Sequence, residues 1–136
     1  MADTVSTRIV SNTKYYYDVV FNNICDGTGE SAVKKVDIST LTGATGSAPL
    51  HLAIERIDSN IAGFKYVSLS WDHAATDVVA VVLPTGYQEL EMCKSRMEDP
   101  APSTDTDGNT GDILLTTNTN AVGNSYNIRV RFKKIR

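Results

Sequence analysis

The segment from 125 to 134 reads SYNIRVRFKK, and its side chains alternate between apolar and polar. The apolar positions are Tyr126, Ile128, Val130 and Phe132, and asparagine or arginine stands between them. Successive side chains of a β-strand point to opposite faces, so this period of two predicts a strand with one buried and one solvated face. Such a strand must pair within a sheet, because its backbone groups have no partners of their own.

A second alternating run and an apolar run flank the polar turn at residues 72–76. In 64–71, Val67, Leu69 and Trp71 share one face, which places Trp71 in the core. The run DVVAVVLP at 77–84 is almost continuously apolar, as in a strand covered on both faces, so we expect it to lie centrally. The two runs together predict an antiparallel hairpin.

Further strands are predicted at 13–23, 31–39 and 50–58, whereas 87–97 has the composition of a helix or a strand. The triplet Tyr15–Tyr17 must turn at least one ring away from the core. In total, eight or nine short strands separated by turn residues predict an all-β fold, an antiparallel β-sandwich of jelly-roll or immunoglobulin-like type. We expect residues 13–136 to form this single domain, and residues 1–12 to be an N-terminal arm or the first edge strand.

The bulk properties exclude several classes of protein. The chain has 136 residues and a formal net charge of -3, which gives no general case for nucleic-acid binding. It contains no apolar run of about 20 residues, as a membrane-spanning helix requires, and no secretory signal at its start. Cys25 and Cys93 have no metal or redox spacing and are expected to be free thiols. We therefore expect synthesis in a cytoplasm, with no membrane partner.

The stretch DTDGNTGDI, residues 105–113, begins like a calcium-binding loop. Asp105, Asp107 and Asn109 occupy alternate positions, as the first three ligands of an EF-hand do. However, Thr110 stands where the loop needs glycine, and Thr116 stands where it needs a bidentate carboxylate. A turn ahead of a strand is the favoured interpretation, and a weak surface calcium site at 105–112 stays the alternative.

No catalytic constellation emerges from the sequence. His73 could act as a general base, with Asp72 or Asp77 as the carboxylate that orients it. However, histidine and aspartate are also ordinary turn residues. No nucleophile elbow or phosphate-binding loop accompanies them. We expect no enzyme activity, no catalytic residues, no cofactor and no metal.

Two segments are candidates for contact with a partner. The last strand gathers basic side chains, including Arg129, Arg131 and Lys133, and either a solvated strand face or docking onto an acidic partner explains them. Direct nucleic-acid contact is disfavoured because no aromatic residues interleave on that face. The polar N-terminal segment contributes Thr4, Val5 and Arg8, which we expect to contact the same partner.

Three runs carry a resemblance to a known family: ICDGTGESAVKKVDISTLTG, FKYVSLSWDHAATDVVAVVLPTGY and TGDILLTTNT, followed by the basic last strand. They resemble a family of small β-rich proteins encoded by tailed bacteriophages. The resemblance covers roughly residues 15–133, with 94–109 poorly matched. It implies a virion structural protein that decorates or cements the capsid exterior, with the major capsid protein as partner and a dimer or trimer on the capsid. The alternative is a receptor- or glycan-binding adhesin module of a tail or head fibre.

Overall fold

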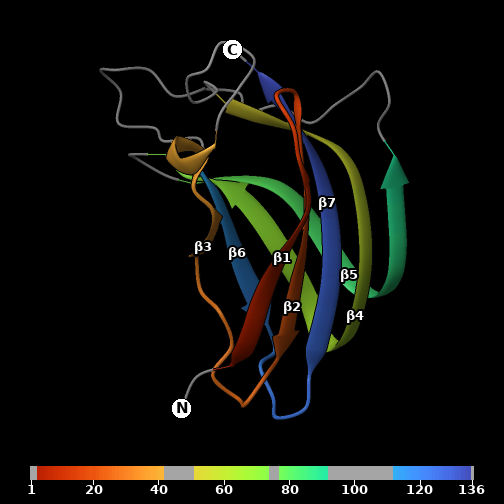
Figure 1. Cartoon of the computed structure of the whole chain (residues 1–136). Coiled ribbons are helices and arrows are strands. Elements are labelled where there is room, and N and C mark those ends of the chain that lie inside the picture. Colours follow the sequence, from red (N-terminus) through yellow and green to blue (C-terminus); the bar gives the residue numbers. More distant parts are fainter. Residues whose placement is uncertain (1–2, 42–50, 74–76, 92–111, 136) are drawn as a thin grey trace.

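The computed structural model describes residues 3–41, 51–73, 77–91 and 112–135 (Figure 1). The strands in these ranges are β1 (Thr4–Asn12), β2 (Tyr16–Ile24), β3 (Val33–Val36), β4 (His51–Trp71), β5 (Val78–Glu91), β6 (Ile113–Asn118) and β7 (Ser125–Ile135). All the strand pairs are antiparallel, and the one helix in this part of the chain is a 3-10 turn, Ile38–Thr40. The prediction of an all-β, antiparallel fold is confirmed.

The strands form one sheet rather than two separate ones. Hydrogen-bonded neighbours follow the order β1-β2-β7-β4-β6-β3, and β5 pairs with β4. The sheet curls on itself into a nearly closed barrel (Figure 1). The predicted sandwich and its eight or nine strands are not confirmed, because the described residues hold seven strands in a single curled sheet.

Strand β4 makes the curl possible. The sequence predicted separate strands at 50–58 and 64–71, but the structure joins them into one strand of 21 residues. The first part of β4 pairs with β7 and the last part pairs with β6. Between them Gly63 has a φ of 89°, and a Cβ there would lie 2.0 Å from Oδ1 of Asn124. Glycine is required at this bend because other residues rarely adopt a positive φ and have a Cβ that would collide.

The prediction that 77–84 lies centrally is wrong. Strand β5 pairs only with β4 among the described residues, so it is an edge. Val79 is 56% exposed and Val82 is 51% exposed, whereas Leu83 is fully buried. A continuous apolar run predicts burial on both faces, but burial also requires neighbouring elements, and β5 has one. Residues 87–91, which had the composition of a helix or a strand, continue β5.

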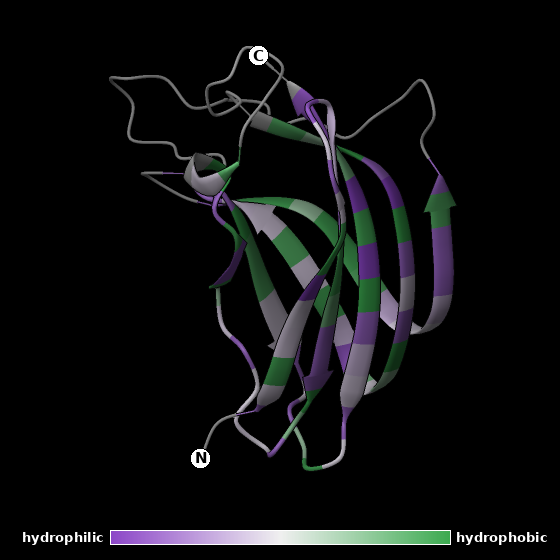
Figure 2. Cartoon of the chain, viewed as in Figure 1, coloured by the Kyte–Doolittle hydropathy of each residue, from purple (hydrophilic) through white to green (hydrophobic). Residues whose placement is uncertain are grey.

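The core lies inside the barrel. Tyr126, Ile128, Val130 and Phe132 are buried, as the alternation in β7 predicts, and Trp71 is buried with 3% of its surface exposed. The fully buried aromatic side chains are Phe21, Phe64 and Phe132. In the tyrosine triplet Tyr17 is buried and Tyr15 is exposed, so the prediction of an outward ring is confirmed. Figure 2 shows apolar and polar positions alternating along the strands of the sheet.

A polar network is enclosed beside this apolar core. The Glu30 carboxylate accepts hydrogen bonds from the Tyr126 hydroxyl (2.5 Å) and the Asn23 amide (2.7 Å) through Oε1. Its Oε2 lies 2.5 Å from Nζ of Lys35, and both side chains of this ion pair are only 5% exposed. Buried charges are tolerated when they are paired and hydrogen-bonded, as here. The network therefore ties the loop after β2 to strands β2, β3 and β7.

The N-terminus is fastened to the same loop. Asp3 Oδ1 accepts hydrogen bonds from the backbone N–H groups of Asp26 (3.2 Å) and Gly29 (3.1 Å), and Oδ2 accepts one from Asn23 (2.9 Å). Burial raises the pKa of Asp3, but these hydrogen bonds outweigh it and hold the pKa below its usual range. Residues 4–12 then pair along β2 as an edge strand.

Because of Tyr126, we expect the stability of the protein to depend on pH in the alkaline range. Burial, together with the hydrogen bond to Glu30, raises the pKa of Tyr126 above its ordinary value. As the pH rises, the unfolded chain therefore loses the Tyr126 hydroxyl proton before the folded chain does. The contribution of Tyr126 to the free energy of unfolding is complete below about pH 10, the ordinary tyrosine pKa, and falls as the pH rises above it. Tyr126→Phe should lower stability by about 1–3 kcal/mol at neutral pH and flatten the loss above about pH 10. Urea unfolding across this range measures both effects; parallel profiles for the two proteins would refute the assignment.

Candidate functional site

The face of the sheet opposite the core carries ordered rows of polar side chains over β1, β2, β7, β4 and β5. Strand pairing places Ser6 opposite Asn22 and Asn22 opposite Asn127. The same row continues from Asn127 to Asn60 and from Asn60 to Tyr87. Residues paired in register on one face are direct neighbours. Residues distant in the sequence therefore form one continuous line of hydroxyl, amide and phenol groups.

Most amide groups of this row have no hydrogen-bond partner within the described part of the chain. The Asn22 amide donates a hydrogen bond to the Ser6 hydroxyl at 3.2 Å. Asn60 and Asn127 are exposed, and neither side chain makes a hydrogen bond within the described part of the chain. A side-chain amide offers two donor hydrogens and an acceptor oxygen. The row therefore presents both kinds of hydrogen-bonding group to a ligand.

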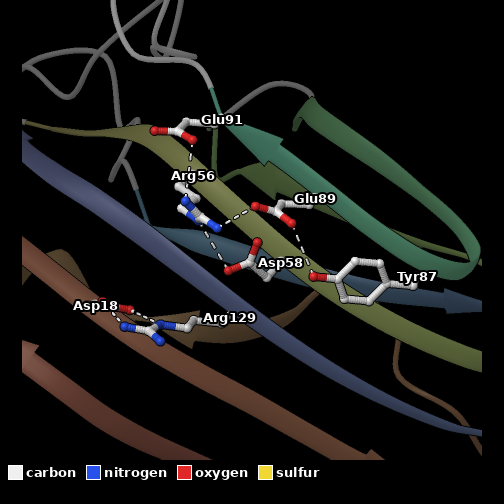
Figure 3. Close-up of polar contacts among 7 residues, drawn as sticks. All are labelled: Asp18, Arg56, Asp58, Tyr87, Glu89, Glu91 and Arg129. Atoms are coloured by element: carbon white, nitrogen blue, oxygen red, sulfur yellow. Dashed lines mark hydrogen bonds and ion pairs between the residues drawn. The ribbon is translucent and has the colours of Figure 1, made fainter.

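Charged residues occupy the neighbouring rows, and most are paired within the protein (Figure 3). Arg129 makes two hydrogen bonds to the Asp18 carboxylate, at 3.0 and 2.7 Å. Arg56 contacts Asp58 at 3.2 Å, and also the carboxylates of Glu89 (2.6 Å) and Glu91 (3.4 Å).

These acidic partners have the expected effect on the two guanidinium groups. The hydrogen bond and charge of Asp18 raise the pKa of Arg129, and those of Asp58 raise the pKa of Arg56. Both guanidinium groups therefore stay charged and have acidic partners on the same outer face of the sheet.

A groove of about 620 Å³ runs over this face. Its lining consists of Ser6, Arg8, Val20, Asn22, Asp58, Ser59, Asn60, Tyr87, Asn127 and Arg129. Tyr87 is 66% exposed, and its hydroxyl donates a hydrogen bond to Glu89 at 3.3 Å. The charge and hydrogen bond of Glu89 raise the pKa of Tyr87, so the phenol stays protonated at neutral pH. The groove therefore has a polar floor and an exposed aromatic ring at one end.

The structure separates the predicted contact residues into two places. Thr4, Val5 and Arg8 lie on the edge strand β1 and are exposed. Arg129, Arg131 and Lys133 lie on β7, which is an inner strand between β2 and β4.

Two of these residues, Arg8 and Arg129, line the same groove. Arg131 faces other groups: its guanidinium lies 4.4 Å from the centre of the Tyr16 ring and 3.9 Å from the Glu55 carboxylate. Because Arg129 and Arg131 have acidic neighbours, the basic last strand presents less free positive charge than its sequence indicates.

Sequence reasoning missed the amides and Tyr87. Asn22 and Asn127 do stand at polar positions of alternating strands, which is the one available signal. Their alignment with Asn60 depends on strand order and register, and neither can be obtained from one strand alone.

The other candidate sites of the sequence have structural roles or lie elsewhere. Asp77 accepts a hydrogen bond from the backbone N–H of His73 (3.0 Å), as a residue of the β4–β5 turn. The described ranges contain no group of three or more His, Cys, Asp or Glu side chains able to hold a metal ion. Cys25 is a buried free thiol. Residues 105–111 of the calcium-loop segment and Cys93 lie outside the described residues.

Asp112, at the end of the calcium-loop segment, is described and is buried. It accepts a hydrogen bond from the backbone N–H of Ile38 (2.8 Å) and lies 2.9 Å from Nζ of Lys34. These contacts hold the segment after β3 against β6.

Two further findings concern the chain as a whole. No helix in the described part is long and apolar enough to cross a membrane. Comparisons with protein-family models, with curated protein sequences and with solved structures found no match to this chain.

Proposed function

We propose that the protein is a non-enzymatic structural component of a tailed-bacteriophage virion, which binds the outside of the head and bridges neighbouring capsid subunits. Its residues resemble small β-rich phage proteins, as described above. The observation that carries the proposal is the set of aliphatic side chains left exposed on the edge strands β1 and β5. Such surface is characteristic of a protein that completes its packing against a partner.

On β1 these side chains belong to the sheet face that is buried elsewhere. Val5 pairs with Asn23 and Ile9 pairs with Val19, and both of these β2 residues are buried. Val5 is nevertheless 47% exposed and Ile9 is 55% exposed. At β1 the core-side face of the sheet is therefore left uncovered by the described residues. A capsid subunit docked along β1 would cover it.

Strand β5 offers a second contact of the same kind. Val79 and Val82 are about half exposed on an edge whose backbone groups have no strand partner on one side in the described part. An exposed apolar edge is a template for association with another chain. Two such edges allow one molecule to contact two neighbours, and many copies on a lattice make modest individual contacts sufficient.

The proposal predicts a mechanical effect on phage heads. Heads lacking the protein should assemble but burst at a lower temperature or pressure than complete heads, because bridging contacts resist the separation of subunits. Adding the purified protein back should restore their resistance. Heads that are equally robust without the protein would refute the cementing role.

A variant of β1 tests the contact surface. Val5→Glu/Ile9→Glu should fold, since both side chains are exposed, but it should neither bind heads nor restore their resistance, because two charges would be buried at the contact. Val122→Glu is the matched control, since Val122 is 80% exposed in the turn between β6 and β7. Equal binding by the β1 variant and the control would show that β1 is not the contact. A truncation of residues 1–7 is less suitable, because it removes Asp3 and the first four of the nine residues of β1.

A further inference from the structure

The groove on the outer face is chemically different from the apolar edges. Its floor is the amide row of Asn22, Asn127 and Asn60, and Tyr87 stands at the β5 end of that row. The exposed valine and isoleucine side chains of the edges have no hydrogen-bonding groups, whereas this row offers donors and acceptors. The two surfaces therefore suit different partners.

The charges of the groove favour an uncharged polar ligand. Arg129 is held by Asp18, and Asp58 is held by Arg56. Arg8 is the remaining cation of the lining, and it has no acidic partner within the described residues. A polyanion such as nucleic acid needs several free cations along its path. A ligand rich in hydroxyl groups needs paired donors and acceptors, which amides supply.

Tyr87 adds a flat apolar surface to these hydrogen-bonding groups. The Tyr87 residue is 66% exposed, and a tyrosine ring has a large apolar area. The hydrogen bond from its hydroxyl to Glu89 fixes the outer end of the side chain. A sugar ring has one face with C–H groups, which packs on an aromatic ring, and hydroxyls at its rim, which reach amides.

The dimensions of the row set the size of the ligand. From Ser6 on β1 to Tyr87 on β5 the row crosses four strand pairings. Strands lie about 4.8 Å apart, so the row is roughly 19 Å long. That length accommodates several sugar units.

We propose that this groove is a binding site for an oligosaccharide, with hydroxyls bound by Asn22, Asn60 and Asn127 and one sugar ring packed on Tyr87. Arg8 adds guanidinium donors at the β1 end. This site does not depend on where the protein sits in a virion, and it uses the outer face of the sheet rather than the exposed aliphatic side chains of β1 and β5. A particle carrying many copies would present many such sites, so weak single contacts would add up to firm attachment.

The test begins with the full chain on an array of neutral and acidic oligosaccharides, from disaccharides to hexasaccharides, followed by calorimetric titration with the best-bound array member. Tyr87→Ala should weaken that binding about 10-fold or more, because the packing surface is lost. Asn127→Ala should weaken it about 3- to 10-fold, because one or two hydrogen bonds are lost. Tyr87→Phe should retain the affinity within about 3-fold, since the ring stays and only the hydroxyl is removed.

Matched controls separate this site from general effects. Tyr15→Ala removes another exposed tyrosine, outside the groove, and should leave binding unchanged. Val5→Glu/Ile9→Glu should lose head binding but keep oligosaccharide binding, so the two proposals fail separately. The site is refuted if no array member binds at millimolar concentration, if Tyr87→Ala and Asn127→Ala bind as the parent does, or if a single-stranded oligonucleotide binds in place of the sugars.

Discussion

Trp71→Ala should lower the free energy of unfolding by about 3–5 kcal/mol, the range for truncation of a large buried aromatic side chain. Trp71 is 3% exposed at the end of β4, where it pairs with Val78 of β5 and Ile113 of β6. Its Nε1 has no hydrogen-bond partner within the described part, so the loss comes from packing and from the cavity left behind. Urea unfolding followed by circular dichroism measures the change.

The matched control for this substitution is Tyr15→Ala. Tyr15 is 56% exposed on the turn between β1 and β2, so its removal should change stability by less than about 0.5 kcal/mol. A loss below about 1 kcal/mol for Trp71→Ala would show that the indole does not support the junction of β4, β5 and β6.

Lys35→Met should cost about 3–5 kcal/mol, because it leaves the buried Glu30 carboxylate without its cation. The ion pair is 2.5 Å long and both side chains are 5% exposed. Tyr126 and Asn23 would still donate to Glu30, but no positive charge would remain in contact. Chemical unfolding of the variant at neutral pH measures the cost.

A double-mutant cycle distinguishes the ion pair from general packing. The double variant Glu30→Gln/Lys35→Met removes both charges, so it should be clearly less destabilised than the sum of the two single variants. Lys65→Met replaces an exposed lysine of β4 and should change stability by less than about 0.5 kcal/mol. Additive losses in the cycle would mean that the two charges do not depend on each other.

Local alternation was the reliable part of the sequence. It predicted the buried face of β7, the core position of Trp71 and the hairpin between β4 and β5, because a strand with one covered face imposes a period of two on its own residues. It did not predict that 50–58 and 64–71 join in one strand. Gly63 and its neighbour Asn124 decide that bend, and they lie 61 positions apart in the chain.

The error at β5 has the same origin. Residues 78–83 are apolar enough for a central strand, yet Val79 and Val82 lie on an edge. Hydrophobicity reports what a segment can bury, whereas the number of neighbouring strands determines what it does bury. The exposed aliphatic residues that support the proposed function could therefore be recognised only after the strand order was known.

By itself, the sequence determined the all-β class, the inward and outward sides of single strands and the absence of recognisable catalytic motifs. Only the tertiary structure decided the curl of the sheet, the edge position of β5 and the alignment of Asn22, Asn60 and Asn127 beside Tyr87. The physical reason for this division is the separation, along the chain, of the residues that interact. Side-chain alternation is a property of neighbouring residues, whereas register and strand order arise from hydrogen bonds between segments far apart in the chain.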